Sequence, residues 1–127
     1  MKKALIVDDA GIMRAKLREI LETKYYVIAE ASTGTEAVEL YEKYKPDFVT
    51  MDISMPDMNG IEALEKIKNI DPEAKVVMIS AAGQIKNVYD CARKGAKTFI
   101  VKPFEREKVI KEIDKLFIEQ SVCLYSE

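Results

Sequence analysis

Histidine and tryptophan are absent from this sequence, and only two of its 127 residues are cysteines. Histidine is the commonest general base and the commonest metal ligand, so any chemistry has to depend on carboxylates, lysines and hydroxyls. Cys91 and Cys123 lie far apart in the chain and form no CxxC pair. We therefore expect two reduced thiols, with neither a zinc site nor a structural disulfide.

Long hydrophobic runs and a surplus of one charge are missing as well. The apolar start of the chain is interrupted at Asp8 and Asp9, and no later stretch is long enough to span a membrane. We expect a cytoplasmic protein without a signal peptide or a membrane segment. The 20 basic and 22 acidic residues give no global attraction to nucleic acid or to an acidic membrane surface.

The length of the chain fits one domain, covering residues 1–127. A short apolar tail begins at about residue 120, with Val122 to Tyr125 as its apolar part. This tail could extend the last helix, pack back on the domain or join a second copy, and the sequence leaves these alternatives open.

Strand-forming residues occur in five short runs, at residues 4–7, 26–29, 48–51, 76–79 and 98–101. Residues 4–7 and 76–79 are uninterrupted apolar runs, which are typical of strands covered on both faces of a sheet. A segment with helical spacing of its apolar residues follows each run. This alternation predicts an α/β fold with a doubly wound, mostly parallel sheet.

Capping residues predict where the first three helices begin. Asp9 is placed to cap the first helix. Thr33 and Glu36 form a capping box for the second helix, and Asn59 precedes the third. The fourth helix is predicted to end at Gly95 in a left-handed conformation, and its inward residues are expected to be Ile85, Val88, Tyr89 and Ala92.

Chemically active side chains follow four of the five predicted strands. Asp8 and Asp9 follow the first strand, Asp52 the third, Ser80 the fourth and Lys102 the fifth, while the second ends without such a residue. The carboxyl ends of parallel strands meet at one edge of the sheet, where ligands bind in open α/β folds. Each residue alone has a plain explanation, as a turn or helix cap or a solvated charge, but their coincidence at one edge predicts a site.

Three carboxylates in one crevice repel one another, so a cation has to neutralise them if they are ionised. Lys102 supplies one positive charge, and the remainder suits Mg²⁺, which binds carboxylates, waters and phosphate oxygens. A carboxylate can also act as the nucleophile towards a phosphoryl group, and Asp52 is the best placed of the three. These residues predict Mg²⁺-dependent phosphoryl transfer.

Four motifs give the chain a family resemblance: Leu5 to Asp9, Met51 to Pro56 with Asn59-Gly60, Ser80-Ala81, and Val101 to Phe104. Their order and spacing resemble receiver domains of two-component signalling, and in particular the CheY-like chemotaxis response regulators. The resemblance covers almost the whole chain. It implies a flavodoxin-like (βα)5 fold with strand order 2-1-3-4-5.

The resemblance also implies a role for each site residue. It makes Asp52 the phospho-acceptor, with Lys102 and Ser80 as contacts to the phosphoryl group and Phe99 as an aromatic that changes rotamer with Ser80. It makes a cis peptide bond precede Pro103. The Mg²⁺ ligands it implies are Asp8, Asp9, Asp52 and the backbone carbonyl of Ser54.

The function implied by the resemblance is that of a stand-alone switch rather than an enzyme, catalysing only its own phosphorylation and slow autodephosphorylation. The phosphoryl donor would be a sensor histidine kinase of the CheA type. The altered face, formed by the fourth helix, fifth strand and fifth helix, would bind a protein target, foremost the flagellar motor switch. A phosphatase is a further partner that the family allows, and a monomer is expected, with a weak dimer as the alternative.

Three other interpretations compete with this one. A single-domain phosphorelay intermediate would pass its phosphoryl group to a histidine phosphotransfer protein. A flavodoxin-type cofactor domain would need a phosphate-binding loop after the first strand, where Asp8-Asp9-Ala10 would repel an anion. A phosphatase of the haloacid dehalogenase class carries a second aspartate two residues after its nucleophile, where this chain has Ser54.

Two positions depart from the pattern that other family members often show. Ser54 and Ala82 stand where those members carry larger polar side chains. With neither an amide nor a carboxylate at these positions to orient water, we expect a slow intrinsic loss of phosphate.

Overall fold

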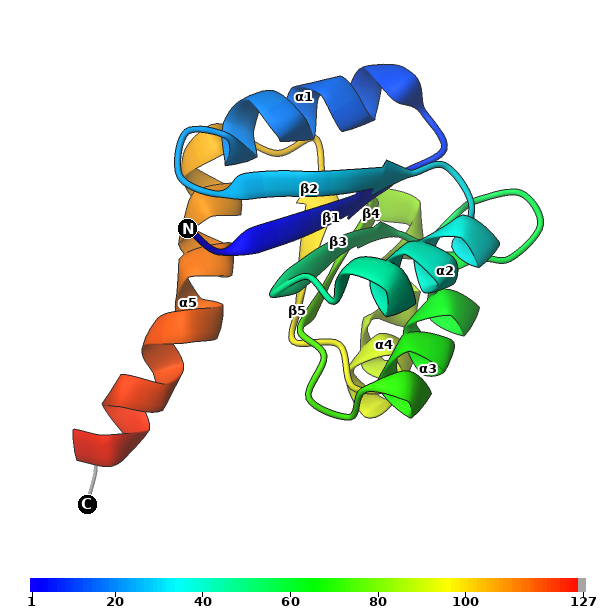
Figure 1. Cartoon of the computed structure of the whole chain (residues 1–127). Coiled ribbons are helices and arrows are strands. Elements are labelled where there is room, and N and C mark those ends of the chain that lie inside the picture. Colours follow the sequence, from blue (N-terminus) through cyan, green and yellow to red (C-terminus); the bar gives the residue numbers. More distant parts are fainter. Residues whose placement is uncertain (126–127) are drawn as a thin grey trace.

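The computed structural model describes the backbone of residues 1–125 and the side chains of residues 1–117 except that of Ile85. Within these residues, strands and helices alternate along the chain (Figure 1). The elements are β1 (Lys3–Val7), α1 (Gly11–Leu21), β2 (Tyr26–Ala31), α2 (Gly34–Tyr44), β3 (Phe48–Asp52), α3 (Gly60–Ile70), β4 (Val76–Ala81), the 3₁₀ helix η1 (Ala82–Asn87), α4 (Val88–Arg93), β5 (Thr98–Lys102) and α5 (Arg106–Tyr125).

The five strands form one parallel sheet in the order β2-β1-β3-β4-β5, which confirms the predicted topology. Helices α1 and α5 cover one face of the sheet, and α2, α3 and α4 cover the other (Figure 1). Because all strands run in the same direction, their carboxyl ends meet at one edge. That edge carries the residues that the sequence singled out.

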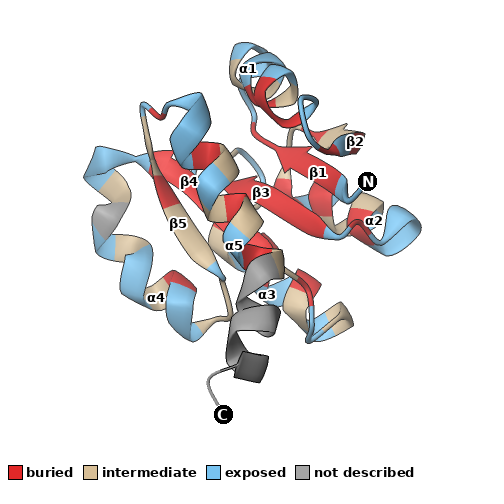
Figure 2. Cartoon of the chain, turned by 90° about the vertical axis from the view of Figure 1, so that its left-hand side faces the viewer, coloured by how far each residue is buried: buried red, intermediate tan, exposed pale blue. Residues whose placement is uncertain are grey.

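Alternate residues of each inner strand enter opposite cores. In β1, Ala4 and Ile6 pack towards α1 and α5, whereas Leu5 and Val7 pack towards α2 and α3. Both faces of a strand are buried in a doubly wound fold, which explains why residues 4–7 and 76–79 are continuously apolar. Figure 2 shows this buried layer along the middle of the sheet.

The predicted caps of α2 and α3 are confirmed. Thr33 Oγ1 accepts a hydrogen bond from the Glu36 N–H at 3.1 Å, and Asn59 Oδ1 accepts from the N–H groups of Ile61 and Glu62 at 2.9 and 3.0 Å. Each side chain thereby satisfies backbone donors that the first turn of a helix leaves free.

The predicted cap of α1 is wrong. Ala10 occupies the N-cap position and makes no side-chain hydrogen bond, while Asp9 is exposed. Asp8 accepts the hydrogen bond from the Ala10 N–H at 2.9 Å instead. An aspartate commonly bonds the N–H two residues ahead, and here this turn leaves Asp9 facing solvent.

The fourth helix differs from its prediction in length and orientation. It begins as a 3₁₀ turn and becomes α-helical only at Val88, so the rotation per residue is larger in its first half. Tyr89 is therefore 75% exposed and Val88 37% exposed, while Cys91 is the buried residue of α4. The predicted stop is confirmed, because Gly95 has a φ of 102°.

Helix α5 extends beyond residue 120, at about which the tail was predicted to begin. The backbone is helical through Tyr125, and the side chains of residues 118–127 lie outside those described. In the described part of the chain, no helix combines the length and the apolar character needed to cross a membrane.

Candidate metal and phosphoryl site

Three carboxylates meet at the carboxyl edge of the sheet. Val7 pairs with Met51, so Asp8 and Asp52, which follow them on neighbouring strands, lie side by side. One oxygen from each of Asp8, Asp9 and Asp52 lies within 4.8 Å of the other two. Asp8 and Asp52 are buried and Asp9 is exposed, so the cluster opens towards solvent on the side of Asp9.

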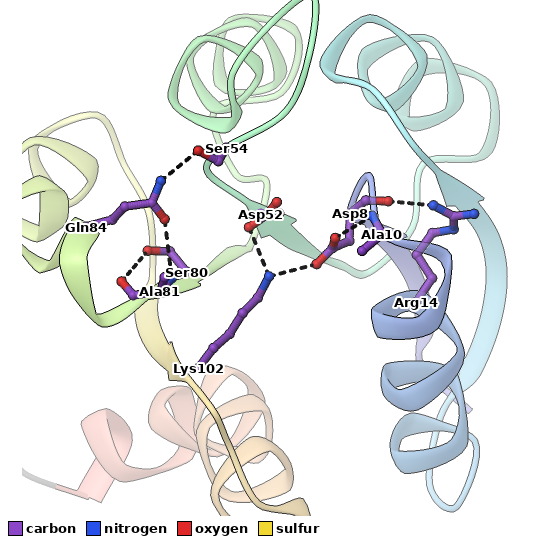
Figure 3. Close-up of polar contacts among 9 residues, drawn as sticks. All are labelled: Asp8, Ala10, Arg14, Asp52, Ser54, Ser80, Ala81, Gln84 and Lys102. Carbon is purple, nitrogen blue, oxygen red and sulfur yellow. Dashed lines mark hydrogen bonds and ion pairs between the residues drawn. The ribbon is translucent and has the colours of Figure 1, made fainter.

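Lys102 reaches into this cluster from the end of β5. Its Nζ lies 3.1 Å from Oδ2 of Asp8 and 3.3 Å from Oδ1 of Asp52 (Figure 3). Since β5 is separated from β3 by β4, the long side chain has to reach across the position of β4 to make both contacts. The structure thus brings Asp8, Asp9, Asp52 and Lys102 together, as predicted.

Burial and charge both act on the carboxyl group of Asp52. Burial, and next the negative charge of Asp8, raise the pKa of Asp52 from its ordinary 3.8 to about 6, although Lys102 opposes the shift. Burial alone would lower the pKa of Lys102, but Asp52 and Asp8 outweigh it and the pKa is raised. Lys102 therefore remains a cation at neutral pH, and one cation leaves the three carboxylates incompletely neutralised.

This donor set fits Mg²⁺. The cluster offers only carboxylate oxygens, the hard ligands that Mg²⁺ prefers, and its open side leaves room for the waters that the ion retains. A divalent cation here would also offset the repulsion that raises the pKa of Asp52. The predicted ligation by the backbone carbonyl of Ser54 stays a prediction.

Ser80 and Phe99, the other predicted side chains, lie on β4 and β5, and among the described side chains no hydrogen bond joins Ser80 to Asp52. Ser80 is fully buried, and its hydroxyl donates to the backbone carbonyl of Ala81 at 3.2 Å. Phe99 is half-buried on β5, opposite Met78, and packs against the core under α2 to α4. The Lys102–Pro103 peptide bond is cis.

Two residues that the sequence analysis missed support the loop of Asp8. Arg14 donates from Nη1 to the backbone carbonyl of Asp8 at 2.7 Å, and from Nε to Glu30 at 3.1 Å. Glu30 also accepts from Arg18 at 2.6 Å. Glu30 is the penultimate residue of β2, the strand that ends without a predicted site residue, and only the spacing of the two arginines on α1 hints at this contact.

Gln84 is a further residue that was missed. Its Nε2 donates to Ser54 Oγ at 2.9 Å, and its Oε1 accepts from the backbone N–H of Ala81 at 3.3 Å (Figure 3). The side chain thus connects the loop that follows β3 with the end of β4. Nothing in the sequence marks a lone glutamine for this position.

Comparison with known proteins identifies the family. The family model for the response regulator receiver domain matches residues 4–114 of this chain. The chain belongs to the response regulator receiver family. The described cluster of acids and lysine thus lies at the carboxyl edge of the sheet of a receiver domain.

Named relatives place this receiver domain among the CheY-like members. It is 50% identical to the chemotaxis protein CheY of Bacillus subtilis over 114 residues, covering 89% of this chain and 95% of that protein. It is 32% identical to the sporulation initiation phosphotransferase F of the same organism over 114 residues, covering 90% of this chain and 92% of that protein.

A solved structure agrees with this placement. The crystal structure of a CheX-CheY-BeF3-Mg²⁺ complex from Borrelia burgdorferi superimposes with a TM-score of 0.88 at 43% identity, covering 91% of this chain and 89% of that chain. This CheY-like relationship confirms the family and the fold expected from the sequence.

Proposed function

We propose that this receiver domain accepts a phosphoryl group on Asp52 from a histidine kinase, in a Mg²⁺-dependent reaction, and then binds a protein target in chemotaxis. The observation that carries the proposal is the convergence of Asp8, Asp9 and Asp52 with Lys102 at one edge of the sheet. Such a site combines a nucleophilic carboxylate with charges of both signs.

Phosphoryl transfer at this site needs positioning and charge compensation more than covalent chemistry. An Oδ atom of Asp52 attacks the phosphorus as the bond to the donor nitrogen breaks, and the imidazole leaves with the bonding electrons. Lys102 already lies within 3.3 Å of Asp52 and can turn to a transferred oxygen. Asp8, Asp9 and Asp52 would hold a Mg²⁺ ion, which would supply positive charge to the phosphoryl oxygens.

The phosphorylated aspartate carries more negative charge than the carboxylate it replaces. We expect the Ser80 hydroxyl to turn from the Ala81 carbonyl towards this group, and Phe99 to follow. A cavity of about 210 Å³ lies beside Phe99, lined by Cys91, Ala92 and Ala96 among others, and offers room for such a change. The site would in this way alter the face formed by α4, β5 and α5.

The face that would change is suited to protein contact. Tyr89 is 75% exposed on α4, which is high for an aromatic side chain without a partner surface. We propose a cytoplasmic switch that receives phosphate from a CheA-like kinase and binds the flagellar motor switch, with no turnover beyond its own phosphorylation and dephosphorylation. We also propose that the protein is a monomer and that a phosphatase removes its phosphoryl group.

A phosphorelay intermediate is the second candidate, favoured by the relationship to the sporulation phosphotransferase. Complementation in Bacillus subtilis separates the two functions. The chemotaxis proposal predicts that the chain restores chemotaxis to a strain lacking CheY, and that Asp52→Ala does not. Restored sporulation in a strain lacking phosphotransferase F, without restored chemotaxis, would favour the relay instead.

A further inference from the structure

Gln84 lies next to the acceptor site and contacts two of the segments that surround it. Ser54 follows β3 two residues after Asp52, and Ala81 follows Ser80 at the end of β4. The amide of Gln84 donates to the first segment and accepts from the second, at 2.9 and 3.3 Å. Figure 3 shows the side chain spanning the space between them, on the opposite side of Asp52 from Asp8.

The backbone N–H of Ala81 is a donor well placed for a phosphoryl group on Asp52. It directly follows Ser80, and Asp52 pairs with Ile79 on the neighbouring strand. A phosphoryl group presents three charged oxygens, and preorganised donors around them stabilise it. In the structure this N–H is already engaged, since Gln84 Oε1 accepts its hydrogen bond.

We propose that Gln84 is a positioning residue that closes the phosphoryl site in its resting state. Its side-chain oxygen accepts the hydrogen bond of the Ala81 N–H, which a phosphoryl oxygen accepts after transfer. Its amide nitrogen donates to Ser54. This inference rests on the proposed function, because it concerns the same site.

The exchange of partners is favourable for the phosphorylated state. The bond from Ala81 to Gln84 is a neutral one of 3.3 Å, at the long end of the range for N–H donors. A charged phosphoryl oxygen forms a shorter and stronger bond to the same donor. Gln84 is then released, and because it belongs to η1, which leads into α4, its release connects the site to the face expected to bind the target.

Gln84→Met tests this role, because methionine has a similar length and cannot accept the hydrogen bond. Gln84→Glu keeps an acceptor for Ala81 but adds a negative charge beside the site. Asn87→Ala is the matched control, because Asn87 lies on the same 3₁₀ helix and its side chain caps nothing. Both positions are partly exposed, so the fold tolerates the three changes.

The experiment combines NMR with kinetics on the whole chain. The Ala81 amide resonance is followed in ¹⁵N-labelled protein with Mg²⁺, before and after addition of beryllofluoride, and the rate of phosphorylation is measured against acetyl phosphate concentration. We expect the resting Ala81 proton of Gln84→Met to shift upfield and that of Asn87→Ala to match wild type. Removing one competing hydrogen bond should lower the half-saturating beryllofluoride concentration and raise the second-order phosphorylation rate about two- to tenfold.

Gln84→Glu is expected to phosphorylate more slowly than wild type. Mg²⁺ affinity should change less than about twofold in Gln84→Met, because Asp8 and Asp9 are untouched. An unchanged Ala81 resonance together with an unchanged rate in Gln84→Met would overturn the inference while leaving the proposed function intact. If wild type itself neither responds to beryllofluoride nor gains phosphate, both the inference and the proposed function are wrong.

Discussion

Gly60, the first residue of α3, packs directly against the backbone of Asp52. A Cβ atom built on Gly60 would lie 2.0 Å from the carbonyl oxygen of Asp52 and 2.9 Å from the Cα of Ile53. The Gly60 N–H also donates to the Ile53 carbonyl at 2.7 Å. The start of α3 and Asp52 are thus fixed against each other by backbone atoms, which cannot move aside as a side chain can.

Gly60→Ala is therefore expected to lower the free energy of unfolding by about 3 kcal/mol or more, because the overlap is with backbone. Gly83→Ala is the matched control, because a Cβ there meets nothing within 4 Å. Urea unfolding followed by circular dichroism measures both. Equal free energies of unfolding for the two variants would show that the backbone after β3 can shift to accommodate the added methyl group, contrary to this prediction.

Asp52→Asn is expected to stabilise the metal-free protein at neutral pH. The folded pKa of about 6 lies above the ordinary 3.8, so the folded state binds the proton more tightly and loses stability as pH rises through 6. At 1.36 kcal/mol per pKa unit, the gain from removing this charge is about 1–3 kcal/mol at about pH 7.5.

The pH dependence distinguishes this cause from a simple change in packing. Because Asp52 becomes protonated as pH falls from about 7 to 4, the advantage of Asp52→Asn should shrink over that range in the presence of a chelator. Mg²⁺ should reduce it too, by stabilising the ionised wild type. An advantage that is the same at about pH 5 and 7.5 would rule out charge repulsion at Asp52 as its origin.

Arg14→Lys is expected to weaken Mg²⁺ binding about tenfold, as changes to groups that orient metal ligands commonly do. Lysine keeps the positive charge but cannot hold both the Asp8 carbonyl and Glu30, as the arginine fork does. Arg18→Lys is the control, because Arg18 contacts Glu30 and Glu22 but not Asp8. Titration calorimetry gives the affinities, and similar values for the two variants would contradict a role of Arg14 in positioning Asp8.

Ala82→Glu is expected to accelerate loss of phosphate at least about tenfold, because a carboxylate there could orient and deprotonate water. Ala82 is exposed and begins η1, two residues after Ser80, so a longer side chain fits without repacking. Decay of the phosphorylated protein after removal of the donor measures the rate, with Ala82→Met as a control for side-chain size. A wild-type decay faster than that of Ala82→Glu would contradict the expected slow intrinsic loss.

The sheet and the acid cluster could be predicted from the sequence because both follow from local patterns. A parallel sheet brings every strand end to one edge, so residues at or just after the strand ends, such as Asp8, Asp52 and Lys102, need no contact information to be placed together. The caps at Thr33 and Asn59 depend on residues within four positions of each other and were predicted for the same reason.

Contacts made by long side chains between segments could not be predicted in this way. Arg14 and Glu30 are 16 residues apart and Gln84 and Ser54 are 30 apart, and each pair meets only because the fold brings two separate segments side by side. Asp9 does not cap α1, because Asp8 accepts the hydrogen bond of the Ala10 N–H and forms a turn. A capping pattern in the sequence cannot tell which of two adjacent aspartates forms the hydrogen bond. Tyr89 was misplaced because the preceding 3₁₀ turn changed the rotation of α4.

The most direct test of the whole account is the intact mass of the protein after incubation with acetyl phosphate, with and without Mg²⁺, at mildly acidic pH. Wild type is expected to gain the mass of one phosphoryl group only when Mg²⁺ is present, and Asp52→Asn to gain none. A wild type that binds Mg²⁺ but gains no mass, or an Asp52→Asn variant that gains as much as wild type, would contradict the assignment of Asp52 as the acceptor.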